Sequence, residues 1–243
     1  MKLLIPCMKC LQEYGQPTGE FCRVEFCDDG RYEITCSHGH ETITVLQQQK
    51  FEVLFDIGAH AIIDGYYREA VSSFTSSLER FYEFSIRTFM EKSESSDAVC
   101  QSCWKTISNQ SERQLGAFIF LWAYCLGESP ELLSNSQINF RNEVIHKGKI
   151  PTRHEALEYG NAILEVLRPK MRLLQQRFPE EVSKVIFWHL RGSQSYVAEN
   201  KQVATMSVQT IISLMAGEES HHQKTLEESL LGLNEWRRRV DGF

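Results

Sequence analysis

The sequence has no excess of basic residues and no apolar run long enough to cross a membrane. Its 26 lysines and arginines are outnumbered by 32 aspartates and glutamates, which gives a net charge of −6. Such a chain has no general attraction to a polyanion, so nucleic-acid binding requires a local basic site. The richest apolar stretch, LGAFIFLWAYCLG, is shorter than the roughly 20 residues of a spanning helix. The apolar run before Pro6 is also too short for a secretion signal, so we expect a cytoplasmic protein without membrane contact.

Internal repeats and low-complexity tracts are absent, which excludes a solenoid or a repetitive array. What is present is a chain of 243 residues with 42% hydrophobic content, enough for one medium domain and a smaller one. Five of the eight cysteines lie near the start, and three follow in a helical region: Cys7, Cys10, Cys22, Cys27 and Cys36, then Cys100, Cys103 and Cys125. Without an export signal, this clustering favours metal binding over disulfides.

The hydrophobic period changes once along the chain. Residues 1–46 alternate as short strands do, and from about Gln47 apolar residues recur every three or four positions, as in helices. Gly65 marks the break of a helical hairpin, and Ser111 begins a nearly all-apolar helix that suits the centre of a bundle. We predict a mainly α fold with three parts: a small β zinc ribbon at 1–46, a helical bundle at 47–176 and a helical extension at 177–243.

Two stretches near the start have the spacing of metal-binding knuckles. CMKC carries Cys7 and Cys10, and CSHGH carries Cys36 and His40 with a glycine between them that lets the backbone turn. Four such ligands make a closed tetrahedral zinc site, and the metal supplies folding free energy that a core this small cannot. We predict a structural zinc ion held by Cys7, Cys10, Cys36 and His40, with His38 as the alternative to His40.

The alternative to a metal site is a set of reduced structural cysteines. Strand alternation places Cys22 on one face with Val24 and Phe26, which indicates a core position, and Cys27 sits beside a turn. The second C-x-x-C pair, CQSC at 100–103, lies in a helical pattern without a partner pair, so core or surface cysteines are the better interpretation there.

The stretch FRNEVIHKGKIP, residues 140–151, combines an arginine and a histidine with nearby lysines. Asn142 lies one turn before His146 on the same helical face, where its amide can orient the imidazole. Arg141 is about 140° away around an ideal helix, so it must reach across or meet the histidine of a second subunit. The negative end of the helix dipole favours the imidazolium form of His146, a proton donor. A similar spacing in RYEITCSH lies inside the zinc region and is a coincidence.

The segment RNEVIH matches the R-N-x-x-x-H motif of the HEPN superfamily, and IIDGYYREAVSSFTSSLERFYE resembles the first helices of its members. The resemblance covers residues 47 to about 176, and the ribbon resembles those fused to bacterial HEPN-like proteins. Many HEPN proteins are metal-independent ribonucleases that act as toxins or in antiphage defence. The resemblance therefore implies RNA as substrate, a homodimer with a shared cleft, and a possible neutralising or defence-system partner. It makes Arg141 and His146 the catalytic pair and Asn142 their companion, with no catalytic metal.

RNA supplies its own nucleophile, the 2′-hydroxyl, so the protein need only move protons and stabilise charge. His146 would transfer the proton, Arg141 would bind the non-bridging oxygens, and Lys147 and Lys149 would bind the backbone. Three other interpretations remain open. The motif can be an ordinary helix end, the whole chain can be a non-catalytic interaction module, or the ribbon can bind DNA as a regulator. The scarcity of basic residues in 1–46 disfavours the last of these.

Overall fold

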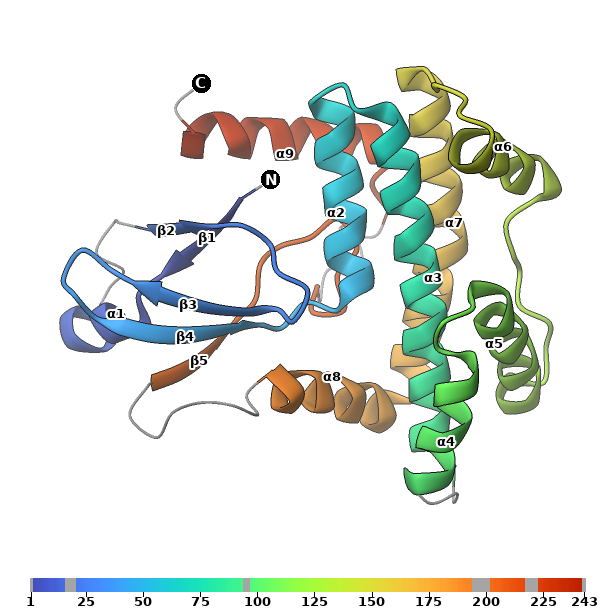
Figure 1. The fold of residues 1–243 in the computed structure, drawn as a ribbon, viewed down its shortest axis with the longest axis horizontal. Coiled ribbons are helices and arrows are strands. Elements are labelled where there is room, and N and C mark those ends of the chain that lie inside the picture. Colours follow the sequence, from blue (N-terminus) through green and yellow to red (C-terminus); the bar gives the residue numbers. More distant parts are fainter. Residues whose placement is uncertain (1, 16–20, 94–96, 194–201, 217–222, 242–243) are drawn as a thin grey trace. The chain divides into compact units, whose positions relative to one another are not determined.

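The computed structural model describes residues 2–15, 21–93, 97–193, 202–216 and 223–241. The chain divides into two compact units (Figure 1). The ribbon unit contains Met1–Gln49 and Ile186–Val208, and the helical unit contains Lys50–Val185 and Gln209–Phe243. Helices predominate and the strands gather near the start of the sequence, which confirms the predicted mainly α class. Residues 177–243 are shared between both units. No helix in the described ranges is long and apolar enough to span a membrane.

The ribbon unit contains two small sheets. The strands β1 (Leu3–Pro6) and β2 (Phe21–Val24) pair antiparallel, and a short helix, α1 (Met8–Tyr14), follows β1. The strands β3 (Arg31–Thr35) and β4 (Glu41–Leu46) form an antiparallel hairpin. Buried side chains from both sheets make the core, including Leu3, Ile5, Ile34, Ile43 and Val45. Only strands are predicted for residues 1–46, and the helix α1 is the exception.

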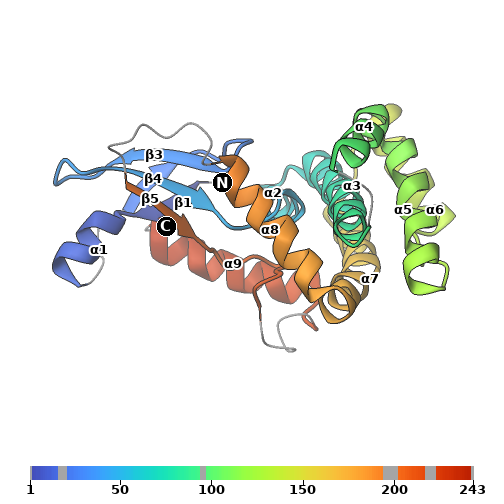
Figure 2. The same ribbon diagram turned by 90° about the horizontal axis from the view of Figure 1, so that it is seen from below.

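A strand from far along the chain completes the second sheet. β5 (Gln202–Met206) runs parallel to β4, with Thr42 opposite Gln202 and Leu46 opposite Met206 (Figures 1 and 2). Glutamines just after β4 hold the incoming segment by their side-chain amides: Nε2 of Gln47 donates to Oγ1 of Thr205 at 2.8 Å. The helical extension predicted at 177–243 therefore contains a strand. The N–H and C=O groups of β5 form hydrogen bonds with the edge of β4, whereas in a helix they would pair within the segment itself.

The helical unit is built around a long hairpin. Gly65, with φ of +82°, separates α2 (Lys50–Ile63) from α3 (Tyr67–Glu91), as the sequence predicted. α7 (Arg153–Arg177) packs against both, beginning at a capping box of Thr152 and Glu155. Helix α8 (Pro179–Ser193) follows, and its second half belongs to the ribbon unit. Later in the chain, α9 (Leu226–Asp241) contacts α2 and α7.

Close packing of these helices requires glycine at two positions. A Cβ atom on Gly58 of α2 would lie 2.6 Å from the ring of Phe74, and one on Gly160 of α7 would lie 2.9 Å from the same ring. Phe74 is fully buried between them. The two glycines therefore let α2 and α7 approach α3 at the level of this ring.

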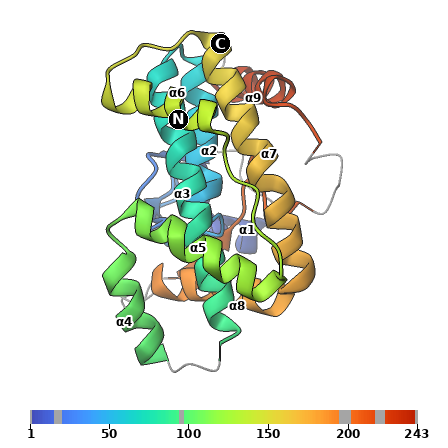
Figure 3. The ribbon, with the colours of Figure 1, turned by 90° about the vertical axis from the view of Figure 1, so that its right-hand side faces the viewer.

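The remaining helices are α4 (Asp97–Ile107), α5 (Ser111–Leu126) and α6 (Asn135–His146). α5 packs on α3, and Figure 3 shows it on the outer side of that helix. It buries Gln114, Phe118 and Trp122, whereas Phe120 and Tyr124 stay 78% and 88% exposed. The prediction that this helix occupies the centre of the bundle is therefore wrong. Its apolar residues lie all around the helix, but α3 covers only one side.

Side chains of the helical unit hold residues 209–215 in a non-helical conformation. The backbone N–H of Ile211 donates to Asp56 at 2.9 Å, and that of Leu214 donates to Glu52 at 2.8 Å. Nε2 of Gln175 donates to the carbonyl of Leu214 at 2.8 Å. The helix expected in TMSVQTIISLMA, residues 205–216, is absent because acidic and amide side chains take the backbone groups that a helix would pair internally.

Candidate functional site

Four metal-ligating side chains meet in the ribbon unit. Cys7 stands at the N-cap of α1 and Cys10 lies one turn further on, so that both sulfurs point to the same end of the helix. Cys36 and His40 flank the turn between β3 and β4, which is closed by hydrogen bonds from Cys36 N to His40 O (3.1 Å) and from Gly39 N to Cys36 O (2.9 Å). The ligand atoms of the three cysteines and the histidine lie within 4.8 Å of one another, so this cluster can hold a metal ion.

The spacing of these atoms agrees with a tetrahedral site. Zinc bonds of about 2.3 Å to sulfur and about 2.0–2.1 Å to nitrogen place two sulfurs about 3.8 Å apart and sulfur and nitrogen about 3.6 Å apart. The Sγ atoms of Cys10 and Cys36 are 3.8 Å apart. Nδ1 of His40 lies 3.3 Å from Sγ of Cys10 and 3.8 Å from Sγ of Cys7. The predicted ligand set thus has the dimensions that the metal needs.

The second nitrogen of His40 has a partner of its own. Nε2 lies 3.3 Å from Oε2 of Glu13, which projects from α1. Carboxylates in this position fix the tautomer and the ring orientation of metal-bound histidines. The alternative ligand, His38, also brings Nδ1 within 3.6 Å of Sγ of Cys10, and its ring lies 5.7 Å from that of Tyr14. Only His40 belongs to the group of four that encloses a common centre among the described residues.

Charge at the cluster also favours a cation. Burial raises the pKa of Cys36, but hydrogen bonds from the backbone amides of His40 and His38 outweigh it and lower the pKa to about 7. Burial raises the pKa of Cys10 to about 11, helped by the neighbouring sulfurs of Cys7 and Cys36. Three thiolates this close repel one another, and a divalent ion at their centre would stabilise all three in the deprotonated form.

The other cysteines lie outside this cluster. Cys22, Val24 and Phe26 are half-buried and alternate with exposed neighbours, but Cys22 is not in the core as the alternation predicted, and Cys27 is exposed. In α4, Cys100 is half-buried and Cys103 is exposed. Within the described ranges, neither belongs to a group of metal-ligating side chains. The second C-x-x-C spacing is therefore a surface feature of a helix.

The arginine–histidine motif lies on α6 in the helical unit. Ser134 caps this helix by accepting a hydrogen bond from Gln137 N at 3.4 Å, and Gly148, with φ of +74°, turns the chain away after it. The motif residues sit in the second half of the helix. Arg141 and Asn142 are half-buried, and His146 is exposed in the last turn.

Arg141 faces the interior side of the helical unit. Its charge acts on the hydroxyls of Tyr82 in α3 and Tyr159 in α7, where it opposes the rise in pKa that burial causes. For Tyr159 the net result is a pKa of about 12, and its hydroxyl also shares a hydrogen bond of 2.9 Å with Thr75. Within the described part of the chain, the Arg141 guanidinium makes no hydrogen bond or ion pair. This leaves its N–H groups available to an anion.

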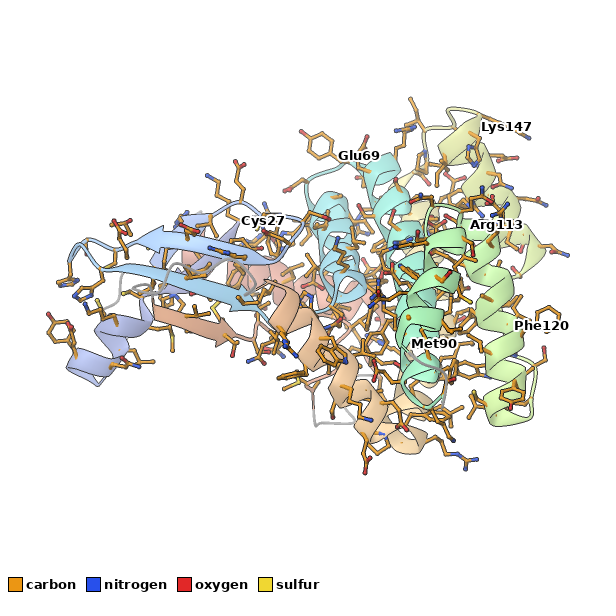
Figure 4. All side chains as sticks on the ribbon, turned by 60° about the horizontal axis from the view of Figure 1, so that its bottom comes forward. Cys27, Glu69, Met90, Arg113, Phe120 and Lys147 are labelled. Atoms are coloured by element: carbon orange, nitrogen blue, oxygen red, sulfur yellow. The ribbon has the colours of Figure 1, made fainter. Side chains whose placement is uncertain are left out.

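No hydrogen bond joins the motif residues to one another in the described part of the chain. Among the described residues, Asn142 and His146 form no hydrogen bond with each other, although they share a helical face. Lys147 is exposed at the end of α6 (Figure 4). Lys149 instead forms ion pairs with Glu155 at 2.9 Å and Glu143 at 3.4 Å, and its ammonium lies 4.9 Å from the ring centre of Phe140.

The pairing of Lys149 changes its expected role. Its pKa is raised, chiefly by the hydrogen bond to Glu155 and then by Glu143. These carboxylates already neutralise the ammonium, so Lys149 joins the end of α6 to the start of α7. Sequence reasoning missed both acidic partners. The T-x-x-E pattern of Thr152 and Glu155 was readable as a helix start, but nothing in it indicated that Glu155 would also bind a lysine.

No family model, curated protein or solved structure matches the chain.

Proposed function

We propose that the protein is a homodimeric, metal-independent endoribonuclease of the HEPN type that acts in the cytoplasm as a toxin or antiphage-defence effector. One observation carries the proposal. Arg141 and His146 are both without a hydrogen bond or ion pair in the described part of the chain, whereas the neighbouring Lys149 is fully paired. The guanidinium of Arg141 could therefore bind the phosphodiester, and the exposed imidazole of His146 could protonate its leaving group.

The roles follow from the chemistry of RNA. The 2′-oxygen attacks the adjacent phosphorus, the bond from phosphorus to the 5′-oxygen breaks, and the products are a 2′,3′-cyclic phosphate and a 5′-hydroxyl. His146 carries the proton from the attacking oxygen to the leaving oxygen. Arg141 stabilises the charge on the non-bridging oxygens through its planar guanidinium. Asn142 orients the imidazole, and Lys147 binds the RNA backbone.

A dimer follows from where the two groups point. Arg141 faces the tyrosines of α3 and α7, whereas His146 is exposed in the last turn of α6. Side chains that diverge in this way share a phosphate more easily when each comes from a different copy. A cleft between two copies of α6 therefore explains the motif better than one helix acting alone.

The metal cluster has a separate, structural role in this proposal, with zinc as the metal. Three cysteines and one histidine close the coordination shell, which leaves no position for a substrate or a water molecule. Zinc would therefore stabilise the ribbon unit, and the RNA reaction would proceed without a metal ion. A defence-system or neutralising partner would regulate the enzyme.

Cleavage of RNA by the purified full chain tests this function. We expect cleavage in buffer without divalent ions, cyclic phosphate ends on the products, and loss of activity in His146→Ala. The matched control is His154→Ala, since His154 is another exposed histidine nearby, with its side chain 81% exposed. Equal activity of the folded His146→Ala protein and the wild type would refute the assignment.

A non-catalytic interaction module is the second candidate. It is favoured by the contrast between the two sites: the four metal-ligating atoms lie together in one chain, whereas no hydrogen bond joins Arg141, Asn142 and His146 in the described residues. In this case the zinc-stabilised ribbon would bind nucleic acid or protein. RNA binding without cyclic phosphate products, unchanged in His146→Ala, would support the module.

A further inference from the structure

Two buried carboxylates on α2 bind a distant segment of the chain, residues 209–215, here called the strap. Glu52 and Asp56 lie one turn apart on the helix and are only 1% and 3% exposed. Asp56 accepts a hydrogen bond from the backbone N–H of Ile211 at 2.9 Å, and Glu52 accepts one from that of Leu214 at 2.8 Å. The strap therefore supplies each buried acid with a donor.

The carbonyl groups of the same two strap residues are held by α7. The guanidinium of Arg168 donates to the carbonyl of Ile211 at 3.4 Å, and Nε2 of Gln175 donates to that of Leu214 at 2.8 Å. The side chains of Ile211, Ile212 and Leu214 are at most 8% exposed. Side-chain hydrogen bonds from two helices and apolar burial thus fix the strap, which has no helix or strand of its own.

The environment of Asp56 favours its protonated form. On α2 its neighbours one turn away are a second acid, Glu52, and His60, which is 5% exposed. α7 contributes Arg168 and Arg172, and the N–H groups of Arg168 donate to backbone carbonyls. Burial raises the pKa of Asp56 to about 7, against the hydrogen bond from the strap and with added repulsion from Glu52.

The other helices packed on α2 do not neutralise Asp56. From α3, Phe74 is fully buried and Ser77 donates to the carbonyl of Phe51 at 2.6 Å. From α9, Arg237 pairs with Asp64, beyond the end of α2, at 2.8 Å. In the described part of the chain none of these side chains binds Asp56, so the strap N–H is its hydrogen-bond partner.

We propose that the strap is a proton-linked latch, which stays closed on α2 while Asp56 is protonated and opens when Asp56 loses its proton. In the closed state the ionised carboxylate is kept from water, and one backbone N–H only partly offsets this cost. Opening gives both carboxylates water in place of the strap. Acidification therefore tightens the strap, and a rise toward neutral pH loosens it. The latch goes beyond the proposed function and does not depend on RNA cleavage.

The direction follows from the two protonation equilibria of Asp56. The pKa of this carboxyl is about 7 in the closed state and returns to the ordinary 3.8 when the strap is open. The closed state binds the proton more tightly, so its advantage is complete below about pH 4 and is lost as pH rises to about 7. From pH 5 to pH 7 the equilibrium constant for opening should rise at least about tenfold. A histidine buried without its proton would give the opposite direction, which separates Asp56 from His60.

Opening changes what the helical unit presents to its surroundings. The closed strap keeps Ile211, Ile212, Leu214 and the two acids buried. The open strap would expose these apolar side chains together with two carboxylates. The latch would therefore present an acidic and apolar surface near neutral pH and hide it under acidic conditions.

Hydrogen exchange of the full chain, measured on peptides covering residues 209–216, tests the latch. After correction for the intrinsic exchange rate, the strap amides should lose protection at least about tenfold from pH 5 to pH 7. They should also exchange at least about tenfold faster than the amides of α3 at each pH, because strap opening leaves the helices folded. Equal exchange of the strap and α3, with the same dependence on urea, would overturn the latch by showing that only global unfolding frees the strap.

Three variants assign the proton to Asp56. Asp56→Asn keeps an acceptor for Ile211 N and cannot ionise, so its strap should show no change in protection between pH 5 and pH 7. Glu52→Gln should keep the change but move it to lower pH, because repulsion from Glu52 adds to the rise in the pKa of Asp56. Asp64→Asn is the matched control, since Asp64 pairs with Arg237 outside the strap, and it should behave as the wild type does.

The outcomes decide between a latch and a static strap. A pH dependence that persists in folded Asp56→Asn, or that is absent from the wild type, would overturn the proposal. Loss of the dependence in Asp64→Asn would also overturn it, because the effect would then belong to the charge of the whole unit. If Asp56→Asn does not fold, Glu52→Gln decides: a shift to lower pH supports the latch, and an unshifted profile refutes it.

Discussion

His40 is bound on both sides of its ring: Nδ1 faces the sulfurs, and Nε2 lies 3.3 Å from the carboxylate of Glu13. The carboxylate holds the tautomer in which Nδ1 has a free lone pair for a metal ion. Cys10 and Glu13, which contact opposite sides of this ring, both belong to the short helix α1. The helix α1 therefore supplies a metal ligand, Cys10, and through Glu13 it also orients a second ligand, His40.

Glu13→Gln should weaken metal binding about 10- to 100-fold without removing a ligand. The amide can still accept a hydrogen bond, but it loses the negative charge that makes the imidazole a better donor to the metal. Competition with a chromophoric chelator would measure the change. Glu25→Gln, an exposed glutamate after β2, should bind as the wild type does. Equal affinity of both variants would show that Glu13 does not support the metal site.

Asp56→Asn should flatten the dependence of stability on pH. Burial raises the pKa of Asp56 to about 7 from 3.8, against the hydrogen bond from Ile211 N and with added repulsion from Glu52. The folded state then binds a proton more tightly than the unfolded state, so this group's contribution falls as pH rises from about 4 to about 7. Asparagine keeps an oxygen acceptor and does not titrate. Urea unfolding at several pH values should give a smaller loss of stability over this window than in the wild type, and an unchanged slope would contradict the assignment.

Two glycine-to-alanine changes should have opposite effects on unfolding. Gly160→Ala places a methyl group against Phe74 and Leu226, so we expect a loss of about 1–3 kcal/mol from overpacking. Gly116→Ala meets open space in α5 and should gain about 0.5–1 kcal/mol, because glycine is unfavourable inside a helix. Denaturant unfolding of the two variants at one protein concentration would compare them. The same sign for both would show that close packing at Phe74 is not the determinant.

Lys147→Ala and Lys149→Ala should separate RNA binding from stability. Lys147 is exposed, so its loss should weaken RNA binding and reduce the salt dependence of that binding by one phosphate contact. Lys149 is paired with two glutamates, and its removal should lower the melting temperature slightly with little effect on RNA affinity. Fluorescence anisotropy with labelled RNA and thermal unfolding would measure the two effects. The reverse pattern would mean that Lys149 releases its partners to bind RNA.

The metal ligands could be predicted from the sequence because their positions follow from local rules. Two residues three apart in CMKC and two others around a glycine turn must bring their side chains together. Glu13 could have been found too, since it lies three residues after Cys10 and thus on the same face of a helix. That required knowing that α1 is a helix, and the strand-like alternation around it concealed this.

The exposure of α5, the ion pairs of Lys149 and the strand β5 could not be predicted, because they depend on contacts between segments that are distant in the sequence. The apolar pattern of α5 indicated burial, but it could not indicate that Phe120 and Tyr124 would stay exposed. The pairing of Lys149 with Glu155 likewise depends on how the chain turns between α6 and α7. The strand β5 carries an ordinary mixed pattern, and only the free edge of β4 selects its conformation.

The parallel pairing of β4 and β5 also sets an order for biosynthesis. A ribosome exposes β4 long before it adds residues 202–206, and in that interval one edge of β4 has open N–H and C=O groups. The helices from α2 to α8 precede β5 and can already form in that interval. The ribbon unit can therefore close only after residue 206 is made, although most of its residues are translated first, and α9 joins the helical unit later still. A nascent chain that stalls before residue 202 would present this edge to chaperones and proteases, so the β4 edge marks incomplete molecules for quality control.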